Sequence, residues 1–244
     1  MQLIGLTGQA GAGKDTVADI LVDYFNFTKM AWADPLYEEV SAAYGGPERM
    51  SVEHLKMRET KELPQFALSR ASLDTGFGGD HEFERVLESA GYGRLDPVSP
   101  RHVLQLWGTE YRRAQDCDYW VNQTRERIAA WKIRMRHEMA DAIRDDDQNY
   151  QEPGGIVIVG TRFWFGNAPS GGNEETVVRE NGGRMWHVWR TMEGGKPKSD
   201  HPSDLPLPIR TGDKLILNFG DIETLATAVQ LALSGNDIVN TESE

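Results

Sequence analysis

The chain has 244 residues, and its formal net charge at pH 7 is −12. A chain of this length fits one α/β domain, and a hydrophobic content of 39% is enough to build a core. The acidic balance argues against broad adhesion to nucleic acid or to anionic membranes, although a local basic cleft could still take a nucleotide. The single cysteine, Cys117, excludes an internal disulfide framework and favours a reducing, cytoplasmic setting. No stretch is long and apolar enough to span a bilayer, so we expect no membrane partner.

The first expected elements form a strand, a glycine-rich turn and a helix. Residues 3–6 are an apolar run typical of a buried strand, and residues 17–25 carry apolar side chains at helical spacing. Between them lies a G-x-x-x-x-G-K pattern that ends at Lys14, which in this context indicates a phosphate-binding loop. Its glycines let backbone N–H groups converge on one anion, and the helix N-terminus adds a positive dipole end. Lys14 supplies a mobile charge for the β- and γ-phosphates.

The residue after the lysine departs from the usual pattern. Asp15 stands where Ser or Thr normally holds magnesium, and Thr16 follows it. A further anion beside a triphosphate is unfavourable unless a cation or the helix N-terminus offsets it. Either Asp15 or Thr16 could therefore be the residue on the magnesium side.

A second short strand is expected from Phe27, ending before Pro35. Asp34 as N-cap and Pro35 in the first turn predict a helix that stops at the glycines of residues 45–46. Asp34 is either a cap alone or a carboxylate at the ligand-binding edge of the sheet. Trp32 is either a core residue or part of a base pocket.

The middle of the chain is less regular. A highly charged helix with a solvated face is expected over residues 53–62. We interpret residues 45–98 as a substrate-covering insertion in a single domain of residues 1–235, followed by an acidic tail at 236–244. A helix beginning near residue 103 should end near Gly108. Arg112 and Arg113 follow it, and they could stabilise a transferring phosphoryl group or pair at the surface with Asp116 and Asp118.

The remaining pattern alternates strands and helices. A buried apolar strand is expected from residue 155 to 159, with further strands at 185–190 and 214–218. Helices are expected at 127–144, 174–180 and 221–233. The long Gly- and Pro-rich loop at 193–213 is too long for a plain connector.

Several of these segments, in this order, resemble phage-type deoxynucleoside monophosphate kinases, a branch of the P-loop nucleotide kinases. The similar segments are residues 13–16, 33–35, 104–110, 118–121, 160–162, 201–204, 207–210 and 217–225. They span nearly the full length, whereas residues 45–98 lie outside the resemblance.

The resemblance implies a P-loop three-layer α/β sandwich with a mostly parallel sheet and an inserted helical substrate or lid region. It implies ATP with Mg²⁺ on the loop at Gly11, Ala12, Gly13, Lys14, Asp15 and Thr16. It implies a deoxynucleoside monophosphate near Asp34, Leu36, Tyr37, Arg101, Gln105, Trp120, Thr161 and Arg162. The residue types suit these roles, because arginines hold a phosphate bidentately and Gln105 can read a base edge. Trp120 could stack on a base or be a core tryptophan.

Two positions depart from the resembling family. Ala10, Gly11 and Ala12 stand where some relatives carry basic residues. Gly160 follows the buried strand where relatives place an Asp, and a carboxylate there normally supports the magnesium shell. Its absence leaves Asp15 or Asp34 for that role, or indicates a changed substrate or lost activity.

We therefore predict a kinase that moves the γ-phosphoryl of ATP to a deoxynucleoside monophosphate, in the host cytoplasm if phage-encoded. It would be a monomer or homodimer without stable nucleic-acid binding. Lys14 and magnesium would bridge the phosphates, and Arg112, Arg113 or Arg162 would neutralise the transferring group. One alternative is a kinase for a modified base or hydroxyl acceptor with Asp34 as base, and another is an inactive nucleotide-binding relative.

Overall fold

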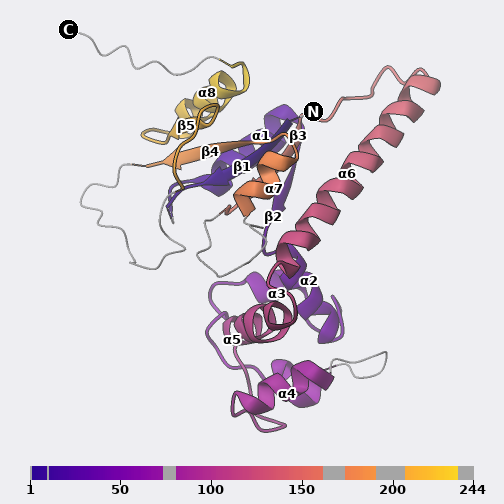
Figure 1. The fold of residues 1–244 in the computed structure, drawn as a ribbon, viewed down its shortest axis with the longest axis vertical. Coiled ribbons are helices and arrows are strands. Elements are labelled where there is room, and N and C mark those ends of the chain that lie inside the picture. The colour runs from indigo at the N-terminus through magenta and orange to yellow at the C-terminus, as the bar shows by residue number, and fades with distance from the viewer. Residues whose placement is uncertain (1, 10, 74–80, 162–173, 191–206, 236–244) are drawn as a thin grey trace. The chain divides into compact units, whose positions relative to one another are not determined.

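The computed structural model describes residues 2–9, 11–73, 81–161, 174–190 and 207–235, in two compact units (Figure 1). The sheet unit comprises residues 1–32 and 125–244, and the helical unit comprises residues 33–124. The acidic tail, the loop before residue 207 and Arg162 lie outside the described residues. No helix in the described part of the chain combines the length and apolarity needed to cross a membrane.

Within the described residues of the sheet unit, five strands form one parallel sheet in the order β2-β3-β1-β4-β5. The strands are β1 (Gln2–Thr7), β2 (Phe27–Ala31), β3 (Gly155–Val159), β4 (Arg184–Trp189) and β5 (Lys214–Leu217). The inner strands β1 and β3 contain continuous apolar runs because helices cover both faces of the sheet. The expected α/β class with a mostly parallel sheet is confirmed.

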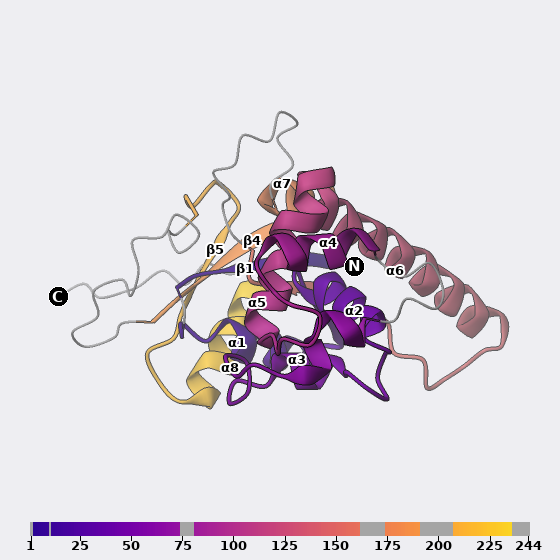
Figure 2. The ribbon, with the colours of Figure 1, turned by 90° about the horizontal axis from the view of Figure 1, so that it is seen from below.

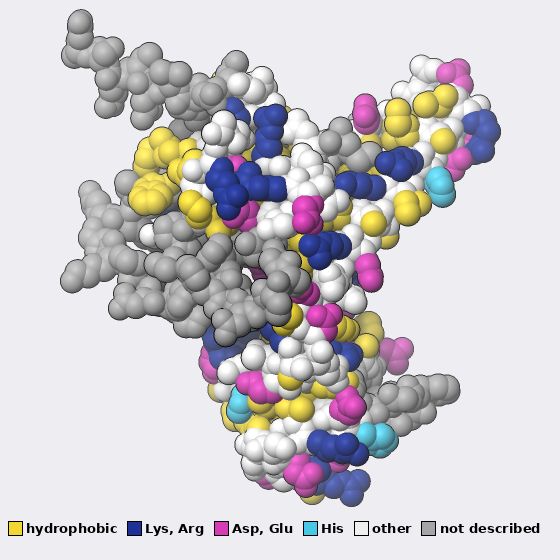
Figure 3. Space-filling model, in the orientation of Figure 1, with side chains coloured by type: hydrophobic (Ala, Val, Ile, Leu, Met, Phe, Trp, Pro, Cys, Tyr) yellow, Lys and Arg dark blue, Asp and Glu magenta, His cyan; other side chains and the backbone are white. Residues whose placement is uncertain are grey.

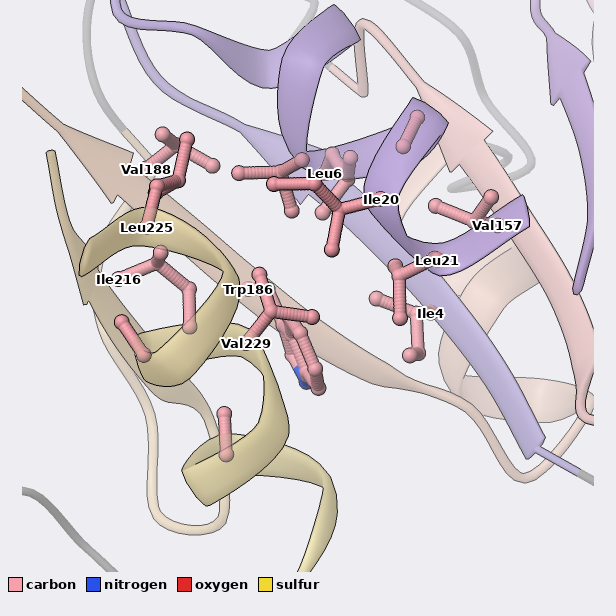
Figure 4. Close-up of a cluster of buried hydrophobic side chains, with 14 of the residues drawn as sticks. Ile4, Leu6, Ile20, Leu21, Val157, Trp186, Val188, Ile216, Leu225 and Val229 are labelled. Carbon is pink, nitrogen blue, oxygen red and sulfur yellow. The ribbon is translucent and has the colours of Figure 1, made fainter. Parts of the chain in front are cut away.

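Helices lie on both faces of this sheet, which gives three layers (Figure 2). On one face, α1 (Lys14–Phe25) and α8 (Ile222–Leu233) pack side by side. Figure 4 shows their apolar side chains meeting those of the strands in one buried cluster. On the other face, α7 (Glu174–Glu180) packs on β1 and β4. Trp131 of α6 (Tyr119–Arg144) donates from Nε1 to Thr28 Oγ1 of β2 at 2.9 Å.

The helical unit has its own buried core. It contains α2 (Asp34–Ala43), α3 (Val52–Lys56), α4 (His81–Ser89) and α5 (Pro100–Gln105), with short 3₁₀ turns at Phe66–Leu68 and Arg70–Ser72. Aromatic side chains fill its centre, where Phe83 and Trp107 have ring centroids 4.4 Å apart. Burial raises the pKa of Tyr44, whose hydroxyl donates to Leu68 O. Residues 45–98 fall in this unit, and their role as a substrate cover stays a prediction.

The helix at residue 100 does not end at Gly108, which corrects one expectation. Ser99 caps it by accepting from His102 N, and α5 then continues directly as a π-helical turn, η3 (Leu106–Arg113). A Cβ on Gly108 would lie 3.5 Å from Leu36 Cδ2, and Gly108 O accepts from Trp120 Nε1 at 3.0 Å. Gly108 therefore lies inside a continuous helix, in ordinary contact with Leu36 and Trp120, and does not end it.

Several other boundaries also differ from the expectations. Ala33, rather than Asp34, is the N-cap residue of α2, so the helix begins at Asp34, one position earlier than expected. The charged run at 53–62 is helical only to Lys56, because Met57 takes an extended conformation. Helix α6 begins at Tyr119 rather than at residue 127. The exposed Cys117 lies in the turn between η3 and α6.

Candidate functional site

The glycine-rich loop between β1 and α1 has the backbone of an anion cradle. Gly8, Gly11 and Gly13 have φ angles of +142°, +79° and +98°, which L side chains rarely adopt. A Cβ on Gly8 would lie 2.2 Å from the carbonyl oxygen of Val188 in β4, so no side chain fits there. The loop lies at the carboxyl end of a central parallel strand, where α/β sheets bind ligands.

Lys14 is the first residue of α1 and its ammonium group lies over the loop. Its Nζ donates to the carbonyl oxygens of Gly8 and Gln9, both at 2.8 Å. These bonds hold a positive charge beside the loop and the helix N-terminus. The Lys14 charge and the positive dipole end of α1 together form an electrostatic environment suited to a polyphosphate.

Asp15 pairs with a lysine that sequence reasoning missed and that it shares with Asp19. Lys29 on β2 places Nζ 3.3 Å from Asp15 Oδ1 and 2.8 Å from Asp19 Oδ1. Partial burial lowers the pKa of Lys29, but the hydrogen bond to Asp19 and the charges of both carboxylates outweigh it and raise that pKa above its ordinary value. Lys29 therefore stays charged and offsets the carboxylate that departs from the loop pattern. Only the pairing of β2 with the rest of the sheet brings it there, so no local sequence signal marks it.

No group of three His, Cys, Asp or Glu side chains that could hold a metal ion is present in the described parts of the chain. Magnesium, however, keeps several waters and takes phosphate oxygens, so it needs few protein ligands. Thr16, half-buried in the first turn of α1, offers a hydroxyl of the usual kind. The loop residues thus fit a magnesium–polyphosphate.

Gly160 and Thr161 follow β3 at the same edge of the sheet. Gly160 has a φ of +82°, and no atom of the described residues lies within 4 Å of a Cβ built on it. Thr161 is 1% exposed, its N–H donates to Leu6 O, and its Oγ1 accepts from Trp32 Nε1 at 3.1 Å. Trp32 is therefore a core residue, the first of its two expected roles. Thr161 is buried and hydrogen-bonded both to β1 and to the residue that follows β2.

A second group of predicted residues meets in the helical unit around Tyr37. Lys61 Nζ donates to the Tyr37 hydroxyl at 3.0 Å and lies 5.6 Å from its ring centroid, and Lys56 Nζ lies 5.0 Å from the same centroid. Lys56 also pairs with Asp34 Oδ1 at 3.0 Å. We call Asp34, Tyr37, Lys56, Lys61 and Arg101 the basic cluster. Sequence reasoning missed its two lysines because they sit in a charged run that favoured a solvated face.

Arg101 and Gln105 add to this cluster from α5. They lie four residues apart, so they share one helix face, and both are exposed. Arg101 N donates to Lys61 O at 2.9 Å, and its side chain pairs with Glu62. Trp120, in contrast, is 7% exposed in the core of the helical unit, which is the core role among its two expected roles.

Arg112 is bound within the helical unit by Glu39, another residue that sequence reasoning missed. Its Nε lies 2.8 Å from Glu39 Oε2, which also accepts from Trp107 Nε1 at 2.9 Å, and Tyr119 donates to the other carboxylate oxygen. Burial lowers the pKa of Arg112, but the bond to Glu39 outweighs it and raises that pKa. The guanidinium also lies 4.4 Å from the Tyr111 ring centroid. Arg113 is half-buried at the end of η3.

A parallel sheet between two layers of helices, with a glycine-rich loop between β1 and α1, defines a P-loop-type α/β protein. No family model matches the chain. It is 29% identical to the deoxynucleoside-5'-monophosphate kinase of Escherichia phage T5, over 93% of this chain and 94% of that relative. It is 27% identical to a putative deoxynucleotide monophosphate kinase of Acanthamoeba polyphaga mimivirus, over 91% of each chain. The expected resemblance to phage-type deoxynucleoside monophosphate kinases is therefore confirmed along nearly the whole chain.

A solved structure, the crystal structure of TT1252 from Thermus thermophilus, aligns with 96% of this chain and 97% of that chain. The sequence identity is 17% and the TM-score is 0.38, which is too low to support an argument about fold or function.

Proposed function

We propose that this chain is an ATP-dependent deoxynucleoside monophosphate kinase. The observation that carries the proposal is the glycine cradle of positive-φ residues with Lys14 at the start of α1. The similarity to two proteins named as deoxynucleotide monophosphate kinases supports the choice of substrate class. The product would be the deoxynucleoside diphosphate.

On the donor side, the loop from Gly11 to Gly13 binds the ATP phosphates through backbone N–H groups. Lys14 leaves the carbonyls of Gly8 and Gln9 to contact phosphate oxygens, exchanging neutral acceptors for charged ones. Thr16 is the better magnesium-side residue, because Asp15 faces Lys29. When bound, magnesium neutralises charge on the β- and γ-phosphates.

On the acceptor side, the basic cluster binds the monophosphate. Lys56 and Lys61 place two ammonium groups beside the Tyr37 ring, and Arg101 is joined to Lys61 through its backbone. A bound phosphate dianion would compete with Asp34 for Lys56 and with Glu62 for Arg101. Tyr37 offers a ring and a hydroxyl beside them, and Gln105 offers an amide that can read a base edge. Leu36 lines the same end of α2 and packs toward Gly108. Trp120 is left out of base stacking because it is buried.

The chemical step needs no general base. An ionised oxygen of the acceptor monophosphate attacks the γ-phosphorus, the bond between that phosphorus and the bridging oxygen breaks, and the electron pair leaves on the β-phosphate of ADP. Positioning and electrostatic stabilisation supply the rate enhancement. Arg112, Arg113 and Arg162 are the candidates for neutralising charge on the transferring phosphoryl group, and Arg112 is held by Glu39.

The test is an acceptor panel. Purified protein is incubated with Mg-ATP and each standard or base-modified deoxynucleoside monophosphate, and ADP and the diphosphate are followed by chromatography. Turnover with at least one acceptor is expected. No turnover with any acceptor would reject the proposal, and binding of Mg-ATP without transfer would indicate a nucleotide-binding protein instead.

Lys14→Ala should remove at least about 99% of this turnover, because the phosphates lose their mobile cation. Its thermal midpoint should stay close to that of the wild type. The matched control is Lys132→Ala, since Lys132 Nζ likewise donates to amide oxygens, those of the Asn181 backbone at 3.5 Å and side chain at 2.9 Å, and lies outside the loop. Equal activity in both variants would contradict the role of Lys14.

A further inference from the structure

Asn218 connects the end of the last strand to the glycine loop. It directly follows β5 and is 9% exposed, and its Nδ2 donates to the carbonyl oxygen of Ala12 at 2.9 Å. Its own backbone N–H donates to Trp189 O at 2.8 Å, which fixes it to the end of β4. Ala12 is itself buried, so this bond is shielded from water.

The same amide packs against Gly13. A Cβ built on Gly13 would lie 2.4 Å from Asn218 Nδ2, so the asparagine occupies the space that any side chain at position 13 would need. Gly13 and Asn218 therefore fit each other as a pair. The absence of a side chain at one position lets the amide of the other reach the loop backbone.

The bond to Ala12 orients the peptide between Ala12 and Gly13. In a trans peptide the C=O and the following N–H point in opposite directions. Holding the Ala12 carbonyl toward Asn218 therefore turns the Gly13 N–H to the other side of the loop. Without an anion, N–H dipoles that converge in such a loop repel one another, so a fixed peptide orientation has to come from the surrounding protein.

We propose that Asn218 is a positioning residue that pre-forms the phosphate loop for the nucleotide. The inference rests on the proposed function only in assigning the loop to nucleotide phosphates, and it does not depend on the acceptor. Losing the Asn218 amide leaves the Ala12 carbonyl buried without its partner, and ordering the loop then has to accompany each binding event. Mg-ADP affinity should therefore fall by about 10- to 30-fold, as expected for one buried hydrogen bond.

The experiment compares wild type with Asn218→Leu, which keeps the side-chain volume and removes the donor. Mg-ADP binding is measured by calorimetry, the thermal midpoint by scanning calorimetry, and KM for ATP and kcat by steady-state assay. The matched control is Asn181→Leu, because Asn181, the residue directly after α7, makes the same kind of bond from its Nδ2 to Val177 O at 2.9 Å. Asn218→Asp, which keeps the shape and places an acceptor against Ala12 O, is the second variant should Asn218→Leu not fold.

A positioning role predicts a specific set of results. Both leucine variants lower the thermal midpoint, but only the Asn218 variants lose Mg-ADP affinity, and only they raise KM for ATP by about tenfold. Their kcat at saturating ATP stays within about twofold of wild type, because bound ATP completes the loop. A catalytic residue would instead lower kcat.

Two outcomes would overturn the inference. If Asn218→Leu and Asn218→Asp bind Mg-ADP as tightly as wild type, the bond to Ala12 does not shape the loop. If the Asn181 control loses as much affinity, the effect is general destabilisation. A wild-type protein that binds Mg-ADP but phosphorylates no acceptor would reject the proposed function and leave this test fully valid, so the two failures are distinguishable.

Discussion

At the scale of single residues, Asp15 shows how the fold accommodates a departure from a motif. The sequence places an extra carboxylate beside the loop, and the structure supplies Lys29 3.3 Å away. The pair is largely exposed, so it contributes little to stability. Its effect should appear in ligand binding, where the uncompensated charge of Asp15 would repel phosphates.

A double-mutant cycle tests this compensation. Lys29→Met should weaken Mg-ADP binding by about 3- to 10-fold, because Asp15 then stays uncompensated near the phosphates. Adding Asp15→Ser to Lys29→Met should restore the affinity. Calorimetric titration of wild type, both single variants and the double variant measures the coupling. Additive effects would show that Lys29 acts independently of Asp15.

Gly8 provides a second test at this scale. Gly8→Ala should destabilise the protein by about 2–4 kcal/mol, because its Cβ would overlap the Val188 carbonyl at a φ of +142°. The control is Gly182→Ala, where φ is +77° but no atom in the described part of the chain lies within 4 Å of the added Cβ, so about 1 kcal/mol is expected. Urea unfolding measures both, and equal losses would contradict the steric argument.

At the scale of elements, a buried ion network ties α7 to the segment before β5. Asp213, whose side chain is fully buried, accepts from Arg179 and from Arg210 N, both at 2.8 Å, and lies 3.3 Å from His187 Nε2. Arg179 also pairs with Glu175 at 2.8 Å. Burial alone would raise the pKa of Asp213, but the bonds from Arg179, Arg210 and His187 outweigh it and lower that pKa below its ordinary 3.8.

The sign of the resulting pH dependence follows from that lowered pKa. Asp213 contributes its full stabilisation above about pH 3.8, the value of the unfolded chain, and loses it as pH falls toward the folded-state pKa. Asp213→Asn should cost about 2–3 kcal/mol at pH 7 and flatten the loss of stability below pH 4. Urea unfolding at pH 3, 4 and 7 measures it, and a variant whose pH dependence matches wild type would contradict the role.

The sequence could predict the elements whose signals are local. The glycines of the loop, the apolar run of β3 and the amphipathic α8 each carry their own pattern, and all three form as expected. The continuation of α5 through Gly108 could not be predicted, because a glycine after an apolar run is also a common helix stop and the contacts of Gly108 with Leu36 and Trp120 arise only in the folded unit. Glu39 and Asn218 escaped notice because their partners lie far away in the sequence. Lys29 is brought to Asp15 only by strand pairing, and Lys56 and Lys61 sit in a charged run that favoured a solvated face.

At the scale of the whole molecule, the chain builds two cores rather than one. The sheet unit and the helical unit each contain a separate cluster of buried apolar residues. The proposed donor loop lies in the first unit and the proposed acceptor cluster in the second. Each ligand should therefore stabilise its own unit through mass action.

Hydrogen exchange read by mass spectrometry tests this division. Mg-ADP at about a hundredfold excess over its Kd should add up to about 2.7 kcal/mol of protection in β1 and α1. A deoxynucleoside monophosphate alone should protect α2 and α5 instead. If the monophosphate protected only β1 and α1, the assignment of the acceptor to the basic cluster would be wrong.

The exposed Cys117 has a practical consequence for such work. It is the single thiol of the chain, and it sits on the surface between η3 and α6, within the unit that carries the basic cluster. A maleimide fluorophore would therefore label one defined position, and no other cysteine would first have to be removed by mutation. The native molecule already carries a unique attachment point for a spectroscopic reporter.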